Sequence, residues 1–232
     1  DGNYIEIQLN FVGHTISYKD VNGKQKGELE ITQLFIQGDK IVLFDKYILS
    51  APEIIDSIIE DFFDIHRYVL APGDYTYELI IEDKNLGYSP ISVEKPLTIR
   101  DLSKEVSFSS ITASESINYA DMNNPTTFTK MGYDIIPLIS NYFPTELKFL
   151  PYYVEIYGTD SFFKDSIFVV EQKIKSNEMS FDLEIYDRHY RYDPARVKAI
   201  AKVIDISLLP TGNYTLELNL LNRNKDVIAQ QT

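Results

Sequence analysis

Two similar stretches occur in the chain: residues 71–79 read APGDYTYEL, and residues 210–218 read PTGNYTLEL. In both, a Pro and a Gly precede a Tyr that opens an alternating run of polar and apolar residues. In many immunoglobulin-like sandwiches, a Tyr near the start of the sixth strand bonds back to a backbone group at the preceding corner. We therefore predict that Tyr75 and Tyr214 hold the same structural corner in two successive β-sandwich domains.

The surroundings of the two corners repeat in the same order. The segment YIEI at 4–7 corresponds to YVEI at 153–156, and DI at 64–65 corresponds to DI at 205–206. Much of the first hundred residues alternates polar with apolar side chains, which is typical of half-buried strands. The count of about seven short strands is that of an immunoglobulin-like sandwich.

Two segments break this alternation. After Pro52 and after Pro194, β-branched and small apolar residues recur at spacings near one helical turn, which predicts a short helix in each segment. The residues concerned are Ile54, Ile55, Ile58 and Ile59 in the first segment, and Val197, Ile200, Ala201 and Ile204 in the second.

The predicted fold is all-β, with two tandem immunoglobulin- or fibronectin-III-like β-sandwich domains. We place the first at 1–101 and the second at 102–232, each with a short helix before its fifth strand. The second domain carries a longer polar loop at 118–127, rich in Asn and Asp. Only a short segment follows Asp226 to close this domain, so we expect the polypeptide to continue beyond Thr232.

Composition excludes several classes of function. Acidic residues outnumber basic ones 35 to 22, a formal net charge of −13, and the basic residues are dispersed. Such a field repels a phosphate backbone, so we expect no nucleic-acid partner. No apolar run approaches the ~18–20 residues needed to span a bilayer, so we expect no membrane insertion. The chain has no Cys, which disfavours a disulfide-stapled domain.

Catalytic and metal-binding patterns are weak. The three histidines, His14, His66 and His189, lack the spacing of a metal site. No G-x-S-x-G stretch is present. The acidic run at 53–64 alternates with isoleucines and is typical of a solvated face. We predict no enzyme activity, no cofactor and no metal.

The stretch YDRHYRYD at 186–193 is the candidate contact surface. As a strand it would place Tyr186, Arg188, Tyr190 and Tyr192 on one face. Tyr and Arg dominate protein interfaces, because each offers a large contact area with a polar end. The alternative is an edge strand with cross-strand ion pairs and stacked tyrosines. The loop at 118–127 is the second candidate.

Residues 128–158 read FTKMGYDIIPLISNYFPTELKFLPYYVEIYG. With the two Tyr corners, this stretch resembles the β-rich region that precedes the GWxTD domain in exported, largely uncharacterised bacterial proteins. The pattern is a lysine near a glycine, a later Pro and an aromatic-rich Tyr-x-Glu-Ile-Tyr strand, and it covers about half of the chain; the GWxTD segment itself is absent. The resemblance implies an envelope or secreted location and a non-catalytic β architecture.

Together these observations predict a non-enzymatic adaptor or scaffold that binds other proteins in a larger extracytoplasmic complex, in the bacterial periplasm or at the cell surface. The alternative is a glycan-binding module that uses the same tyrosines as stacking platforms.

Overall fold

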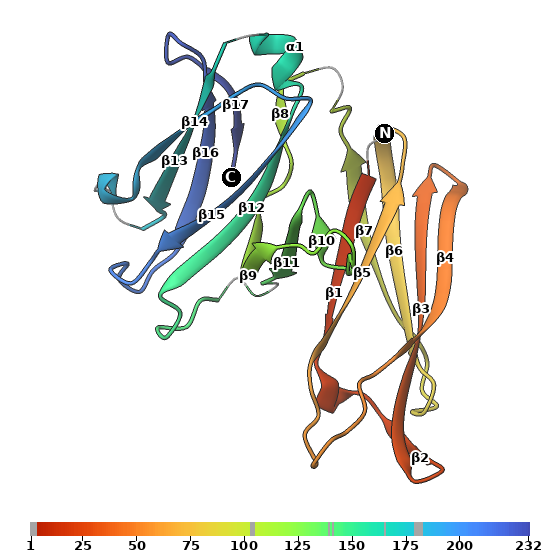
Figure 1. Ribbon diagram of the computed structural model, residues 1–232. Helices are drawn as coiled ribbons and strands as arrows, with labels where there is room; N and C mark the ends of the chain where they lie inside the picture. The colour runs from red at the N-terminus through yellow and green to blue at the C-terminus, as the bar shows by residue number, and fades with distance from the viewer. Residues whose placement is uncertain (1–3, 103–104, 139, 141, 165, 179–182) are drawn as a thin grey trace. The chain divides into compact units, whose positions relative to one another are not determined.

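The computed structural model describes residues 4–102, 105–138, 140, 142–164, 166–178 and 183–232. The chain is all-β, as predicted, and carries the short α-helix α1 (Thr159–Phe163) (Figure 1). It divides into two compact units, Asp1–Asp101 and Leu102–Thr232. Each unit is a sandwich-like arrangement of sheets and is described by itself.

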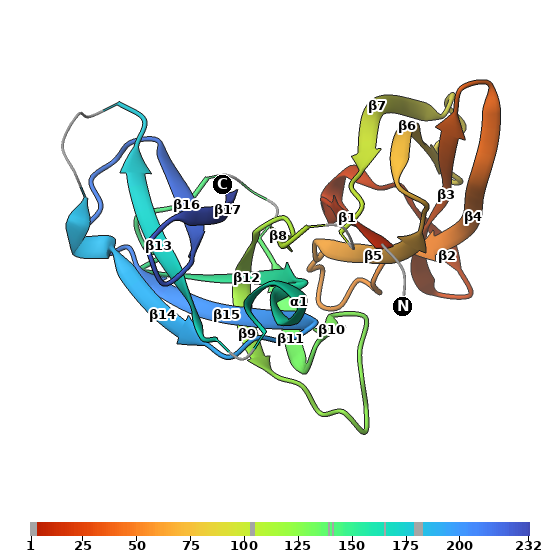
Figure 2. The same cartoon turned by 90° about the horizontal axis from the view of Figure 1, so that it is seen from above.

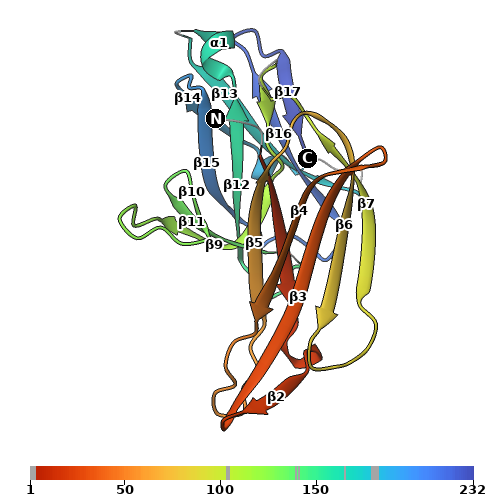
Figure 3. The same ribbon diagram turned by 90° about the vertical axis from the view of Figure 1, so that its right-hand side faces the viewer.

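The first unit consists of two layers. Its elements are β1 (Tyr4–Phe11), η1 (Gly13–Thr15), β2 (Tyr18–Val21), β3 (Lys24–Gln37), β4 (Lys40–Ser50), β5 (Phe62–Val69), β6 (Gly73–Asp83) and β7 (Ile91–Ile99). One layer pairs β1 with β5; the other has the order β2-β3-β6-β7, with β4 also paired to β3. Figure 3 shows the long strands β3, β6 and β7 of the second layer. All pairings are antiparallel.

Strand β3 supplies the centre of this core because every second side chain points inward. Leu29, Ile31 and Phe35 are buried and pack on apolar residues of the facing layer. Gln33 interrupts this apolar row and is fully buried. A buried amide must be hydrogen-bonded, and the side chain of Gln33 donates from Nε2 to the Tyr47 hydroxyl (3.0 Å).

The second unit has a larger first layer. Its strands are β8 (Ser107–Phe108), β9 (Thr112–Tyr119), β10 (Thr129–Lys130), β11 (Tyr133–Pro137), β12 (Phe149–Tyr157), β13 (Phe168–Ser176), β14 (Arg188–Tyr192), β15 (Val197–Asp205), β16 (Tyr214–Leu221) and β17 (Val227–Gln231). One sheet has the order β10-β11-β9-β12-β15, with β8 paired to β12, and the other the order β14-β13-β16-β17. Figure 2 looks down on the strands of both sheets.

Six strands of each unit share one topology. The pair β1-β5 matches β12-β15, and the order β4-β3-β6-β7 matches β14-β13-β16-β17. Gln33 pairs with Leu79, as Gln172 pairs with Leu218. The same number of residues therefore separates Gln33 from Gln172 and Tyr75 from Tyr214. The repeat seen in the sequence is a repeat of strand order and register, of the kind shared by fibronectin-type sandwiches.

The two corner tyrosines make the same hydrogen bond. The hydroxyl of Tyr75 donates to the Ala71 carbonyl and that of Tyr214 to the Pro210 carbonyl, both at 2.8 Å and both four residues back. Tyr75 is buried (7% exposed), whereas Tyr214 is only partly buried. Each bond ties the start of its strand, β6 or β16, to the connection that precedes it.

The predicted short helix before each fifth strand is wrong. Residues 52–60 form a loop in which Asp56 and Ser57 have positive φ (50° and 66°) and Ile55 bridges Ile58. Residues 197–205 are strand β15, paired along its whole length with β12. β-branched residues lose side-chain freedom in a helix and pack well on a pleated surface, so tertiary pairing decides their conformation.

Candidate binding groove in the second unit

The predicted contact residues lie at one edge of the second unit. The sequence predicted a strand that includes Tyr186, and this is wrong: Tyr186 ends the 3-10 helix η2 (Glu184–Tyr186). Strand β14 begins at Arg188 and has Tyr190 and Tyr192 on the same side. The ring centroid of Tyr192 lies 5.8 Å from that of buried Phe168, so this side faces the sandwich interior.

The opposite side of β14 carries a cross-strand ion pair. His189 lies opposite Glu171 of β13, and its Nε2 is 3.2 Å from a Glu171 carboxylate oxygen. Among the described residues, β14 pairs only with β13 and β15 only with β12. Both strands are therefore sheet edges, with backbone N–H and C=O groups that have no strand partner. The alternative from the sequence was an edge strand with cross-strand ion pairs and stacked tyrosines. The structure shows the edge position and the His189–Glu171 contact, whereas no tyrosine of β14 stacks on another tyrosine among the described residues.

A cavity of about 270 Å³ opens between these two edges. One wall comes from η2 and β14 and the other from β15. Lining residues that bear on its chemistry are Gln172, Tyr186, Arg188, Tyr190, Ile204 and Asp205. Three of the four residues predicted to make contacts thus line one groove; Tyr192 lies beside it, against the core.

The rim of the groove is apolar and exposed. Ile185 is 62% exposed, Val203 58% and Leu208 74%, and all three line the cavity. Single exposed apolar residues are ordinary. Three of them around one cavity form an apolar surface, and its burial by a partner would be favourable. One sequence feature could have indicated this rim: Leu208 and Leu209 are adjacent before the corner, and neighbouring residues of an extended segment point to opposite sides. In the structure only Leu209 packs on the core.

The floor of the groove holds a hydroxyl without a partner. Tyr186 is 7% exposed, and its buried hydroxyl has no hydrogen-bond partner among the described residues. Burial, followed by the nearby Asp205 carboxylate, raises the pKa of Tyr186, so the group stays protonated and can donate. The hydroxyl oxygen is shielded from solvent, so it belongs to the core beneath the groove and not to its open surface.

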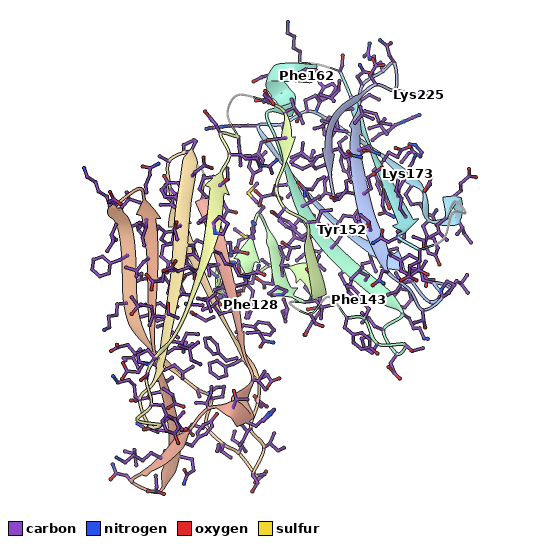
Figure 4. The ribbon with its side chains drawn as sticks, turned by 180° about the vertical axis from the view of Figure 1, so that it is seen from behind. Phe128, Phe143, Tyr152, Phe162, Lys173 and Lys225 are labelled. Atoms are coloured by element: carbon purple, nitrogen blue, oxygen red, sulfur yellow. The ribbon has the colours of Figure 1, made fainter. Side chains whose placement is uncertain are left out.

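Gln172 fixes the position of Tyr186. Its Oε1 accepts from the hydroxyl of Tyr152 (3.0 Å), and its Nε2 donates to the backbone carbonyl of Tyr186 (3.2 Å). Tyr152 comes from β12 in the facing sheet and is labelled in Figure 4. The hydrogen bonds cross the core from one sheet to the other, which holds the floor of the groove in place.

Basic residues outnumber acidic ones along this edge by one. Residues 184–205, which include η2, β14 and β15, carry Arg188, Arg191, Arg196, Lys198 and Lys202 against Glu184, Asp187, Asp193 and Asp205, in a chain of net charge −13. The Nη1 atom of Arg188 donates to the carbonyls of Ile185 (2.9 Å) and Asp187 (2.8 Å). No described carboxylate forms a salt bridge with this guanidinium.

Lysines cover the tyrosine rings. The Nζ atom of Lys202 lies 4.4 Å from the ring centroid of Tyr190, and that of Lys198 lies 5.7 Å from that of Tyr192. Both distances are within the range of a cation–π contact. These ring faces therefore already have a neighbour in the chain.

The equivalent edge of the first unit is filled by its own side chains. By register, Tyr47 stands where Tyr190 stands, and Asp45 where Arg188 stands. Tyr47 donates to Asp64, and the imidazole of His66 lies between Asp64 (3.1 Å) and Asp45 (3.4 Å). The rings of Tyr47 and His66 are stacked, with centroids 4.3 Å apart. The open groove thus belongs to the second unit's version of a shared architecture.

The second candidate, the loop at 118–127, is organised around Asp121. The carboxylate of Asp121 accepts from the Asn123 backbone N–H (3.0 Å) and the Asn124 side chain (2.8 Å). The hydrogen bond from Asn124, and then that from Asn123, lower the pKa of Asp121. These bonds explain the Asn and Asp content of the segment as turn chemistry.

Two further results concern metals and membranes. Within the described ranges, no group of three or more His, Asp or Glu side chains is arranged to hold a metal ion. No helix in those ranges has both the length and the apolar character required to cross a membrane.

Comparison with known proteins adds little. No protein-family model matches the chain, and no curated protein matches it in sequence. Among solved structures, a transglutaminase of red sea bream is similar over 99% of this chain, with 7% sequence identity and a TM-score of 0.30. The chain covers 28% of that protein. A likeness at this level contributes nothing to the assignment of fold or function.

Proposed function

We propose that this chain is a non-enzymatic adaptor that binds protein partners through the groove between β14 and β15, as part of an extracytoplasmic envelope or secreted assembly. The observation that carries the proposal is the groove itself. It combines two free sheet edges with an apolar exposed rim in one place. This combination matches what partners recognise at exposed sheet edges.

The proposed location rests on two features of the sequence. The chain contains no Cys, and residues 128–158 resemble a region of exported bacterial proteins. Fractionation of cells that express the native gene should recover the protein outside the cytoplasm. Recovery in the cytosolic fraction alone would contradict the location and leave the binding proposal standing.

A protein partner fits the groove better than a glycan. Sugars stack on open aromatic faces, whereas Lys202 lies over the ring of Tyr190 and Tyr192 packs on Phe168. The proposal that the chain is not an enzyme rests on the sequence, which carries no catalytic motif such as G-x-S-x-G.

Affinity purification tests the adaptor proposal. Partners that co-purify with the wild-type chain should be lost with Leu208→Asp, because this places a charge on the apolar rim. Leu208 is 74% exposed, so the variant should still fold, as circular dichroism would verify. Tyr88→Asp is the matched control at a 75% exposed residue of the first unit. If both variants keep the same partners, the groove is not the binding surface.

A further inference from the structure

We propose that the occupant of the groove is an extended peptide segment of a partner protein, with one apolar side chain inserted between Ile185, Val203 and Leu208 and an acidic residue beside it. This inference rests on the adaptor function proposed above and specifies what the adaptor binds. Three independent properties of the groove support it: its size, its polar groups and its charge.

The size of the cavity favours a single side chain. Small-molecule sites usually enclose about 300–1,000 Å³, and this cavity, at about 270 Å³, lies just below that range. Its rim is aliphatic, and buried Ile204 of β15 forms part of its wall. An inserted Leu, Ile or Met side chain would cover the rim residues and remove their apolar surface from water.

The polar groups of the groove match a peptide backbone. The carboxylate of Asp205, which lines the cavity, accepts from the Ser207 backbone N–H through one oxygen (3.0 Å), and its other oxygen would accept from a peptide N–H. The free edges of β14 and β15 offer further backbone hydrogen bonds to an extended chain, as in strand addition.

The charge of this edge favours an acidic neighbour for the apolar residue. The guanidinium of Arg188 is held by backbone carbonyls and forms no salt bridge with a described carboxylate, so its remaining N–H groups are available for a partner carboxylate. The ammonium of Lys202 lies over the Tyr190 ring at the same groove. Elsewhere the chain is acidic, so this edge is where an acidic segment would be attracted.

The first unit serves as an internal control. The residue equivalent to Arg188 is Asp45, which accepts a hydrogen bond from the Tyr68 hydroxyl (2.9 Å) and contacts His66. The edge of the first unit presents a carboxylate that already has polar partners. The edge of the second unit presents the Arg188 guanidinium, which donates to two backbone carbonyls and forms no salt bridge with a described carboxylate. An acidic peptide should therefore bind the chain at one site only.

A displayed library of random linear peptides, selected against the full chain, tests the inference. Enriched peptides should share an apolar residue next to Asp or Glu, and the best should bind with one-to-one stoichiometry by calorimetry. Leu208→Asp places a charge on the apolar rim and should weaken peptide binding about tenfold or more. Arg188→Gln should weaken binding similarly and flatten its salt dependence.

Two outcomes would overturn the inference. One is the absence of an enriched consensus; the other is a consensus peptide whose affinity is unchanged in both Leu208→Asp and Arg188→Gln. Tyr88→Asp, at a 75% exposed residue of the first unit, is the matched control and should leave peptide affinity unaltered. If the inference fails but Leu208→Asp still abolishes co-purification of a partner, the adaptor function survives with a folded partner surface as occupant. If Leu208→Asp has no effect either, both proposals fall.

Discussion

The two tyrosine corners allow one prediction to be made twice within one molecule. Tyr75→Phe and Tyr214→Phe each delete a hydroxyl that donates at 2.8 Å to a carbonyl four residues back. The deleted atom and the bond are the same, but the surroundings differ: Tyr75 is buried and Tyr214 is only partly buried. The difference between the variants therefore measures the effect of burial on one hydrogen bond.

The expected magnitudes follow from this difference. A typical hydrogen bond contributes about 0.5–1.5 kcal/mol, and a carbonyl left without a partner away from water adds about 1–3 kcal/mol. Water can replace the hydroxyl at Pro210, so Tyr214→Phe should cost about 0.5–1 kcal/mol. At Ala71 the bond is partly shielded, so Tyr75→Phe should cost about 1.5–3 kcal/mol. For domains near this size, each kcal/mol lowers Tm by about 4–8 °C.

Hydrogen exchange with mass spectrometry is the appropriate assay, because it reports on each unit separately within the intact chain. Exchange should accelerate in β6 and its neighbours for Tyr75→Phe, and less so in β16 for Tyr214→Phe. Tyr88→Phe, at a residue that is 75% exposed, is the control and should change neither unit. Equal losses of stability in the Tyr75→Phe and Tyr214→Phe variants would refute the role of burial. If neither variant loses stability, the hydrogen bond at the corner has no structural role.

Three further perturbations concern the first unit. Gln33→Leu removes the acceptor of the Tyr77 hydroxyl (2.9 Å) and should cost about 1–3 kcal/mol in urea unfolding; an unchanged midpoint would contradict the role of the amide. Gly13→Ala places a Cβ against the Glu60 carbonyl and should destabilise the unit by about 1–3 kcal/mol, which would lower Tm. An unaltered Tm would show that the segment around Glu60 can move to make room for the Cβ. Burial, then Asp64, raises the pKa of Tyr77 to about 12 from 10.0, so the folded state holds this proton more tightly. Stability from this group is complete below pH 10 and lost between pH 10 and 12; Tyr77→Phe should reduce that alkaline loss, as followed by circular dichroism.

Much of the fold was accessible from the sequence because its signals are local. The alternation along β1 and β3 and the Pro–Gly–Tyr corners depend on neighbouring residues only, and the structure has strands and corners at these positions. The isoleucines at 54–59 led to the wrong prediction of a helix. Over so short a segment, isoleucines one helical turn apart cannot be distinguished from isoleucines that flank a turn. Residues 197–205 misled for a different reason: long-range pairing with β12 overrides local spacing.

The candidate site was only partly accessible. The stretch 186–192 drew attention through its Tyr and Arg content, and three of its residues line the groove. Which face of the strand points inward depends on pairing with β13, which composition does not encode. The rim residues Ile185, Val203 and Leu208 come from three separate segments, so no local pattern could join them. The burial of Gln33 in β3 and of Gln172 in β13 was not predicted, because a single Gln in a strand usually faces solvent.

The interval from buried glutamine to corner tyrosine has the same length in both units, from Gln33 to Tyr75 and from Gln172 to Tyr214. Both ends lie in strands that pair in matching register, and the residues that fill one edge or open the other lie within or beside this interval. Replacement of residues 33–75 by residues 172–214 should therefore keep the chain length and the register between the two central strands. Such a chimaera should carry the groove-forming residues of β14 and β15 in both units.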